Sequence, residues 1–228
     1  MPSRLSIAWP KWRNNTLPHI GNDIVDLTNI AARDKSKDTL FLKRVFLPTE
    51  ESLIVGNVKP DTVLWSLWSA KEAAYKAVMK ANMKVSSSPR RYRVILPDMY
   101  EIQLKKSTSY KGWVETPEGT VFLTTMVTSQ FVHSLCIYPI GPIPKDLIWQ
   151  IKPCPPEQDA SLYIRHLAGK KLAFHYHLPA SFWKITERKE GFPPLVYFRE
   201  KLTPIEISLS HDGRFVAFSL LLSKSFTF

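Results

Sequence analysis

The chain has 228 residues, which is enough for one large hydrophobic core or two small ones. Its 44% hydrophobic and 22% charged residues are typical of a globular protein, and no apolar run approaches the ~18 residues that span a bilayer. The 31 lysines and arginines exceed the 20 aspartates and glutamates, so the net charge is +11. Nucleic acid, a polyphosphate ligand or an acidic protein would each suit that charge. No helix-turn-helix, zinc-finger or RNP-type pattern accompanies it, so we expect no nucleic-acid partner.

The cysteines and the first residues indicate the compartment. The two cysteines, Cys136 and Cys154, are too few for a disulfide framework and fit a reducing compartment. Residues 1–19 form an N-terminal extension that has basic residues but no sustained apolar segment, unlike a signal peptide. We therefore expect a cytoplasmic protein without a membrane partner.

The first half of the chain, residues 20–140, predicts a strand, then helices, then a run of strands. Residues 20–27 have the β-branched pattern of a short strand. A helix begins near Pro48, with acidic residues in its first turn, and a longer helix covers about 61–80. The later pattern changes to strands separated by turn residues, at 92–96, 99–105, 111–115, 120–128 and 131–138.

The second half, residues 157–228, follows a proline-rich stretch that we expect to be a linker at 141–156. It predicts a helix at 158–168, a strand at 172–177, a helix at 180–189, and strands at 195–198 and 205–222, the last bent at Asp212-Gly213. Residues 126–135 faintly resemble 209–218, with one gap. Chance similarity explains this as well as duplication does; a duplication would make the chain two α+β halves joined at the linker.

The longer predicted helix combines charged and apolar side chains. Trp68, Glu72 and Lys76 are spaced four apart and share one face, with Lys71 on the adjoining face. A Glu72–Lys76 pair could simply stabilise a solvated face by about 0.2–0.5 kcal/mol. However, apolar residues cover most of the circumference, namely Leu64, Trp65, Leu67, Ala70, Ala73, Ala74 and Ala77. Charges on a buried helix must be paired or hold a ligand, so both interpretations stay open.

Two acidic residues, Asp23 and Asp26, interrupt the first predicted strand, although acids are disfavoured in strands. Asp23 could cap a turn after Gly21, with Asp26 beginning the next loop. Alternatively, Asp23 and Glu72 provide the oxygen ligands of Mg²⁺, which favours one or two carboxylates together with water and phosphate oxygens.

A serine–histidine pair precedes a predicted turn near the C-terminus. Asp212-Gly213 explains the turn itself, and His211 could merely close it. Alternatively, Ser210 and His211 donate hydrogen bonds to an anionic phosphate oxygen. The sequence has no Gly-x-Ser-x-Gly elbow, Walker loop or Gly-x-Gly-x-x-Gly turn, which counts against serine hydrolases, ordinary nucleotide hydrolases and dinucleotide enzymes. The residues alone predict a metal-and-phosphate site to which both halves contribute.

Together these segments resemble the 4′-phosphopantetheinyl transferase superfamily. Residues 21–26 look like its Gly-x-Asp strand, and residues 68–76 fit its Trp-x-x-Lys-Glu-Ala-x-x-Lys helix at every specified position. Residues 41–51 resemble the segment between those motifs in holo-acyl-carrier-protein synthases, and residues 208–213, after 191–194, resemble that group's closing strand. The two main motifs in this order, about fifty residues apart, are more specific than either alone.

The resemblance implies a reaction and a role for each matching residue. The enzyme would transfer 4′-phosphopantetheine from coenzyme A to a serine of an acyl or peptidyl carrier protein, with Mg²⁺, and release 3′,5′-ADP. Asp23 and Glu72 would hold Mg²⁺, and Lys76 would contact phosphate. Glu72 would take the serine proton, either directly or through a metal-bound water. Lys71 would orient Glu72 or bind phosphate. The other candidates for the coenzyme A phosphates are Arg44, Ser210 and His211.

The resemblance also implies an acidic carrier protein as partner. A run of basic residues would suit its surface, namely Arg33, Lys35, Lys37, Lys43 and Arg44. A non-catalytic module that binds coenzyme A or a carrier protein is the alternative function.

Two departures from the family pattern concern the metal site and the order of the halves. Larger two-half members have an acid two residues after the metal aspartate, where this chain has Val25, which leaves water or Asp26 as the third ligand. Those members place the Ser-His element before the metal motif, whereas here it follows, as in single-half synthases of about half this length. We therefore expect an α+β fold of two similar halves that form a monomeric pseudo-dimer, with the metal-binding half first.

Overall fold

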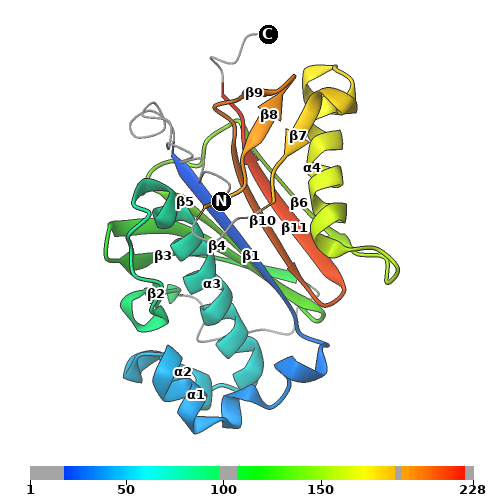
Figure 1. The fold of residues 1–228 in the computed structure, drawn as a ribbon. Helices are drawn as coiled ribbons and strands as arrows, with labels where there is room; N and C mark the ends of the chain where they lie inside the picture. Colours follow the sequence, from blue (N-terminus) through cyan, green and yellow to red (C-terminus); the bar gives the residue numbers. More distant parts are fainter. Residues whose placement is uncertain (1–17, 98–106, 188–191, 224–228) are drawn as a thin grey trace, which may run out of the picture.

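The computed structural model describes residues 18–97, 107–187 and 192–223. Its α+β architecture contains two larger antiparallel sheets, each covered by one long helix (Figure 1). The elements of the first half are β1 (His19–Asp26), α1 (Thr39–Val45), α2 (Pro48–Val55), α3 (Pro60–Ala81), β2 (Arg93–Ile95), β3 (Ser107–Thr116), β4 (Gly119–Thr128) and β5 (Phe131–Tyr138). Those that follow are β6 (Leu147–Pro153), α4 (Ala160–Tyr176), β7 (Trp183–Ile185), β8 (Val196–Phe198), β9 (Lys201–Leu202), β10 (Glu206–Asp212) and β11 (Phe215–Leu221).

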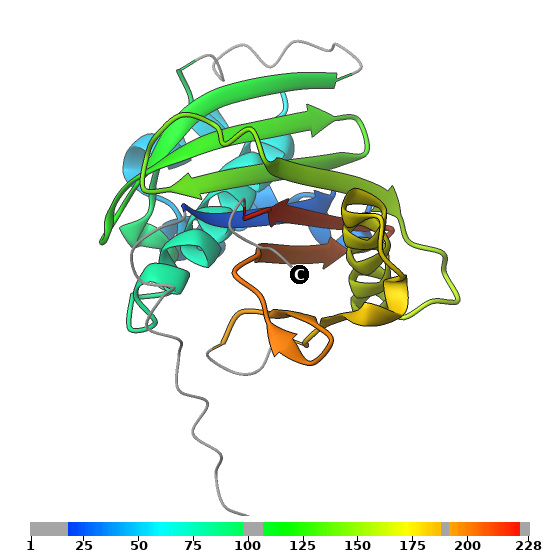
Figure 2. The same ribbon diagram turned by 90° about the horizontal axis from the view of Figure 1, so that it is seen from above.

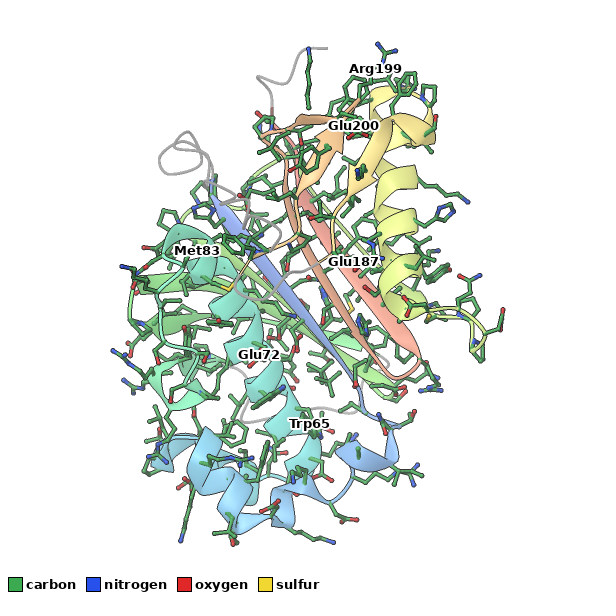
Figure 3. The ribbon with its side chains drawn as sticks, in the orientation of Figure 1. Trp65, Glu72, Met83, Glu187, Arg199 and Glu200 are labelled. Atoms are coloured by element: carbon green, nitrogen blue, oxygen red, sulfur yellow. The ribbon has the colours of Figure 1, made fainter. Side chains whose placement is uncertain are left out.

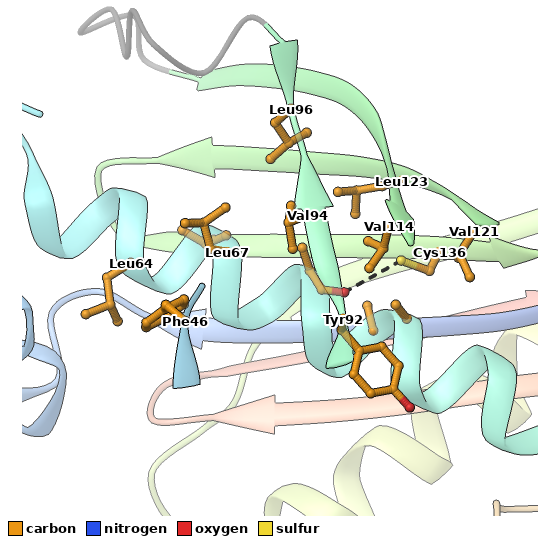
Figure 4. Close-up of a cluster of buried hydrophobic side chains, with 14 of the residues drawn as sticks. Phe46, Leu64, Leu67, Tyr92, Val94, Leu96, Val114, Val121, Leu123 and Cys136 are labelled. Atoms are coloured by element: carbon orange, nitrogen blue, oxygen red, sulfur yellow. Dashed lines mark hydrogen bonds between the residues drawn. The ribbon is translucent and has the colours of Figure 1, made fainter. Parts of the chain in front are cut away.

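The first sheet has the strand order β1-β5-β4-β3-β2, and α3 packs across it. In β4 the side chains alternate between the core and the other face, which gives the period of two that the sequence shows. Figure 4 shows the resulting core, in which buried side chains of α3 meet those of the sheet and Phe46, which follows α1; the labelled residues of α3 and the sheet include Leu64, Leu67, Val94, Val114, Val121, Leu123 and Cys136.

Gly21 allows β1 to lie directly against α3. A Cβ atom at this position would overlap the carbonyl oxygen of Ala73 and lie 2.7 Å from the backbone nitrogen of Ala77. Only glycine permits this approach of helix and strand. The glycine of the Gly-x-Asp motif therefore sets the depth at which α3 sits on the sheet.

The second sheet has the strand order β10-β11-β6, and α4 packs against β10 and β11. A small third sheet, β7-β8-β9, lies beside α4 and shares its core. Within the described ranges, no helix is long and apolar enough to cross a membrane.

Side chains of β10 join the two larger sheets at the edge of β1 that faces away from β5. The backbone N–H groups of Asn22, Ile24 and Asp26 donate to side-chain oxygens of alternate residues on β10. The acceptors are Ser208 Oγ at 2.9 Å, Ser210 Oγ at 3.2 Å and Asp212 Oδ2 at 2.8 Å. Hence β1 and β10 lie side by side (Figures 1 and 2), joined by side chains where a continuous sheet would use its backbone.

Most predicted elements of the first half are confirmed, including the helices near Pro48 and over 61–80 and the strands at 111–115, 120–128 and 131–138. The strand expected at 99–105 lies outside the described residues, as does nearly all of the extension 1–19.

Three expectations for the later part of the chain differ from the structure. Residues 172–176 continue α4, because Ala168 and Leu172 are buried one turn apart on the same helical face. The helix expected at 180–189 is replaced, as far as it is described, by a short 3₁₀ turn and β7, where Trp183 is buried and Lys184 is exposed. The expected linker 141–156 contains β6, which pairs with β11 along its whole length.

Candidate active site

A cavity of about 260 Å³ lies where β1, α3 and β10 meet. Its acidic lining residues are Asp23 from β1, Glu72 from α3 and Asp212 from β10. Trp65 and Trp68, on successive turns of α3, form an aromatic wall; Figure 3 labels Trp65 and Glu72 along this helix. The other lining residues are Ile24, Val25, Asn29, Ala31, Ala32 and His211.

The aromatic wall is fixed to the segment that follows β1. Trp65 Nε1 donates to the carbonyl oxygen of Ala32 at 2.7 Å, and the Phe41 ring packs against both tryptophans. Asp61, at the start of α3, accepts hydrogen bonds from the backbone N–H groups of Asp34 and Ser36. These contacts hold one rim of the cavity against the N-terminal end of α3.

Asp23 is held by one carboxylate oxygen. Its residue is only 8% exposed, and Oδ1 accepts hydrogen bonds from Lys76 Nζ and from Ser210 Oγ, both at 2.8 Å. Over the described ranges, Oδ2 accepts no hydrogen bond. The carboxylate therefore has a fixed orientation and one oxygen available to a ligand.

Lys76 contacts Asp23 but is not among the residues that line the cavity. Besides Asp23 Oδ1, its ammonium donates to the carbonyl oxygen of Asn22 at 3.1 Å. Ser210 donates to Asp23 and accepts from the N–H of Ile24, so its hydroxyl is engaged on both sides. Both residues, which were predicted to contact phosphate, orient Asp23 in this structure.

Asp212 and His211 end β10 at the mouth of the site. Asp212 Oδ2 accepts the N–H of Asp26, whereas His211 is exposed and lines the cavity. Burial raises the pKa of Asp212; the hydrogen bond from the Asp26 N–H opposes this shift, and the negative charges of Asp26 and Asp23 add to it. Three acids therefore lie near one another at this end of β10.

Asp26 is engaged elsewhere. It is 1% exposed, and it accepts hydrogen bonds from Arg214 Nε at 2.9 Å, Arg214 Nη2 at 3.0 Å and Thr28 Oγ1 at 2.8 Å. Burial opposes its ionisation, but the hydrogen bonds from Arg214 and Thr28 win and hold the pKa of Asp26 well below its usual range. Gly213, at φ 49°, leaves no room for a Cβ beside this carboxylate. Asp26 therefore clamps the β10–β11 turn and does not line the cavity.

The donor chemistry of the cavity fits Mg²⁺. This ion prefers oxygen ligands and usually keeps several waters, so one or two protein carboxylates suffice. Asp23 has an oxygen available, and Glu72 lines the same cavity. Among the described residues, no three His, Cys, Asp or Glu side chains are grouped closely enough to hold a metal together. The protein's direct share of the coordination would come from Asp23 and Glu72.

Two predicted phosphate ligands lie away from the cavity. The ammonium of Lys71 is 1% exposed and is bound to Glu50 Oε2 at 2.8 Å and to backbone carbonyls of Pro89 and Tyr92. Burial lowers the pKa of Lys71, which Glu50 partly offsets. Arg44 is exposed on α1, over the Phe41 ring. In this structure Lys71 therefore binds Glu50 and backbone carbonyls, on a face of α3 rotated by about 100° from Glu72, and it does not line the cavity.

Asp23 and Glu72, the acids of the two sequence motifs, line one cavity, and β10 contributes His211 and Asp212 to the same lining. Residues 19–127 match the family model of the 4′-phosphopantetheinyl transferase superfamily. The resemblance to this superfamily is confirmed over that segment, which contains Asp23, Glu72 and Lys76, and it supports transferase activity. A search of the curated proteins found no match to the chain. Ser210, His211 and Asp212 lie outside the segment that matches the transferase superfamily.

The sequence analysis missed Lys80, one turn beyond Lys76 on the same face of α3. Its buried ammonium donates to the carbonyl oxygens of Ile20 at 2.6 Å and Ile207 at 2.7 Å, and lies 3.0 Å from Glu206 Oε2. It thus connects β1 and β10 next to the site. The spacing of four from Lys76 could have indicated it, since residues four apart share a helical face.

Proposed function

We propose that this protein transfers the 4′-phosphopantetheine group of coenzyme A to a serine of an acyl or peptidyl carrier protein, as holo-acyl-carrier-protein synthases do, and releases 3′,5′-ADP. The observation that carries the proposal is the meeting of Asp23 and Glu72, from the two superfamily motifs, at one cavity. Mg²⁺ held by Asp23 and Glu72 would neutralise charge on the pyrophosphate of coenzyme A.

Glu72 acts as the general base. The serine oxygen of the carrier forms a bond to the phosphorus that bears pantetheine, the pyrophosphate P–O bond breaks, and 3′,5′-ADP leaves with the bridging oxygen. The serine proton passes to Glu72, whose side chain is partly exposed in the cavity and can release it to solvent. Positioned general bases typically contribute about 10²–10⁴-fold to the rate.

Lys76 and Ser210 keep Asp23 in place, and Lys76 also supplies positive charge close to the phosphates. His211 is exposed at the mouth and donates to a phosphate of the nucleotide, the 3′-phosphate by preference. Arg44 is exposed and does not line the cavity, so we place it with the carrier-protein surface.

The carrier protein docks beside the aromatic wall. Ala31 and Ala32 line the cavity, and the segment that continues from them carries the basic run Arg33, Lys35, Lys37, Lys43 and Arg44. Most of these side chains are exposed, and they favour an acidic partner whose serine must reach Glu72.

One active site per chain accords with a pseudo-dimer of two α+β halves, 20–140 and 157–228, the second of which takes β6 into its sheet. Each larger sheet has its own long helix, α3 or α4, and the cavity takes residues from both sheets. A monomer would then be sufficient for activity.

Intact-mass spectrometry of an apo carrier protein tests the proposal. The carrier, incubated with the enzyme, coenzyme A and Mg²⁺, should gain one phosphopantetheine, and Glu72→Gln should lower the rate about 10²–10⁴-fold. Glu157→Gln, which changes an exposed acid outside the cavity lining, is the matched control and should act like wild type. Binding of coenzyme A without any transfer, across several carriers, would instead favour the non-catalytic binding module.

A further inference from the structure

Asp212 brings a third carboxylate to the cavity from the C-terminal hairpin. It lines the same cavity as Asp23 and Glu72, although it lies 85 residues beyond the segment that matches the transferase superfamily (212 against 127). Val25, two residues after Asp23 on β1, lines the cavity as well and is apolar. The third acid at the cavity therefore comes from β10.

The orientation of Asp212 is fixed by β1. Its Oδ2 accepts the N–H of Asp26 at 2.8 Å, as the last of the three side-chain contacts that join β10 to β1. Its Oδ1 accepts no hydrogen bond from the part of the chain that the structure describes. Asp26, the other candidate acid in this region, is bound to Arg214 and Thr28.

The charges around the cavity are unbalanced. Arg214 neutralises Asp26, and Lys76 pairs with Asp23 through Oδ1 alone. Asp212 makes no ion pair among the described residues. Asp23, whose side chain is 12% exposed, also keeps Oδ2 without a hydrogen-bond partner in those ranges. A divalent cation would compensate the negative charge of these two carboxylates.

We propose that Asp212 is a third carboxylate of the divalent-cation site, which strengthens binding of an ion held by Asp23 and Glu72. The inference deepens the proposed function and rests on it for the identity of the site. Because these three acids are not grouped closely enough to coordinate one ion together, Asp212 acts from beyond direct coordination. Residues in that position typically change metal affinity about 10–100-fold.

Mn²⁺ titration of the full chain tests this inference. The free ion is measured by its electron paramagnetic resonance signal, and the titration is run with and without coenzyme A. Asp212→Asn keeps an oxygen that can accept the Asp26 N–H, and it should raise the Mn²⁺ dissociation constant about 10-fold or more. Glu157→Gln removes the same charge from an exposed position outside the cavity lining and should change it less than about 2-fold.

A second variant guards against a folding defect. Asp212→Ser gives position 212 the same hydroxyl with which Ser208 and Ser210 accept β1 N–H groups, so the variant should fold. It should weaken Mn²⁺ binding as much as Asp212→Asn does. Thermal unfolding of each variant reports whether the hairpin is intact. Mn²⁺ affinities of both Asp212 variants equal to that of Glu157→Gln would overturn the inference, as would wild type that binds no Mn²⁺ with coenzyme A present.

The carrier-protein assay with wild type separates the two proposals. If wild type modifies carriers but Asp212→Asn binds Mn²⁺ as tightly as wild type, the transferase proposal stands and the role of Asp212 is wrong. If wild type modifies no carrier but Asp212→Asn binds Mn²⁺ more weakly, the transferase proposal is wrong and the three-carboxylate cation site stands.

Discussion

The two long helices, α3 and α4, each cover one sheet, but they use their lysines in opposite ways. On α3, Lys71 and Lys80 are buried and Lys76 is mostly covered, and all three bind oxygens of neighbouring elements. On α4, Lys170 is exposed, and the buried residues are apolar or small. Burying an ammonium is costly unless it is fully paired. The helix with the buried lysines, α3, is the one that contributes residues to the cavity, whereas α4 only packs against its sheet.

The largest expected effect comes from removing a buried ammonium of α3. Lys80→Met leaves Glu206 buried beside β1 without its lysine, so we expect a loss of about 3–5 kcal/mol in the free energy of unfolding. Urea unfolding measures it. Lys170→Met on α4 is the matched control, expected within about 0.5 kcal/mol of wild type. Equal losses at both positions would contradict the contrast between the helices.

A second prediction separates structure from chemistry within α3. Lys76→Met should lower kcat about 100-fold, because it removes positive charge near the phosphates and one of the two hydrogen bonds to Asp23 Oδ1. Lys71→Met should destabilise the protein but leave kcat per folded molecule within about 3-fold of wild type, since its ammonium binds Glu50 and does not line the cavity. The two are compared by carrier modification after correcting for the folded fraction. A similar kcat loss in both would place Lys71 in the site after all.

This contrast also explains how far the sequence could predict the molecule. Period-two alternation was sufficient for β3 and β4, the flanking turn residues for β5, and a long apolar helix pattern for α3, because those elements build one continuous core. The motif acids Asp23 and Glu72 were expected to meet, and they line one cavity. Residues 172–177 were wrongly expected to form a strand, since a short apolar run does not distinguish a strand from a buried helical face.

Other features of the site depend on which way a side chain points. Lys71 and Glu72 are adjacent in sequence, but successive helical residues are rotated by about 100°, so only one of them faces the cavity. In the sequence, the presence of an aspartate at position 212 was explained by the turn that it forms with Gly213. Its position beside Asp23 depends on how β10 lies against β1, which no local pattern encodes.

A third prediction tests how tightly each helix packs. Gly21→Ala forces α3 away from β1, so we expect a loss of about 1–3 kcal/mol in unfolding free energy and lower activity, because Asp23 lies two residues on. Gly169→Ala in α4 meets no atom within 4 Å and should stabilise the protein by about 0.5–1 kcal/mol through helix propensity. Chemical denaturation measures both. A gain at Gly21 would show that the helix can shift without cost.

The smallest expected effect concerns the clamp by which the first half holds the C-terminal hairpin. Because the pKa of Asp26 is below its unfolded value of 3.8, its contribution to stability is present above that pH and is lost as the pH falls further. Arg214 is half exposed, so solvent screens the pair and we expect Asp26→Asn to cost only about 1 kcal/mol at pH 7. The difference in unfolding free energy between wild type and Asp26→Asn, measured from pH 7 down to pH 2, should therefore be constant above about pH 4 and narrow steadily below it. Glu157→Gln, on an exposed acid away from the clamp, should follow wild type at every pH. A constant difference between Asp26→Asn and wild type over the whole range would mean that the hairpin is held by the shape of the turn around Gly213, and that the charge of Asp26 adds nothing to it.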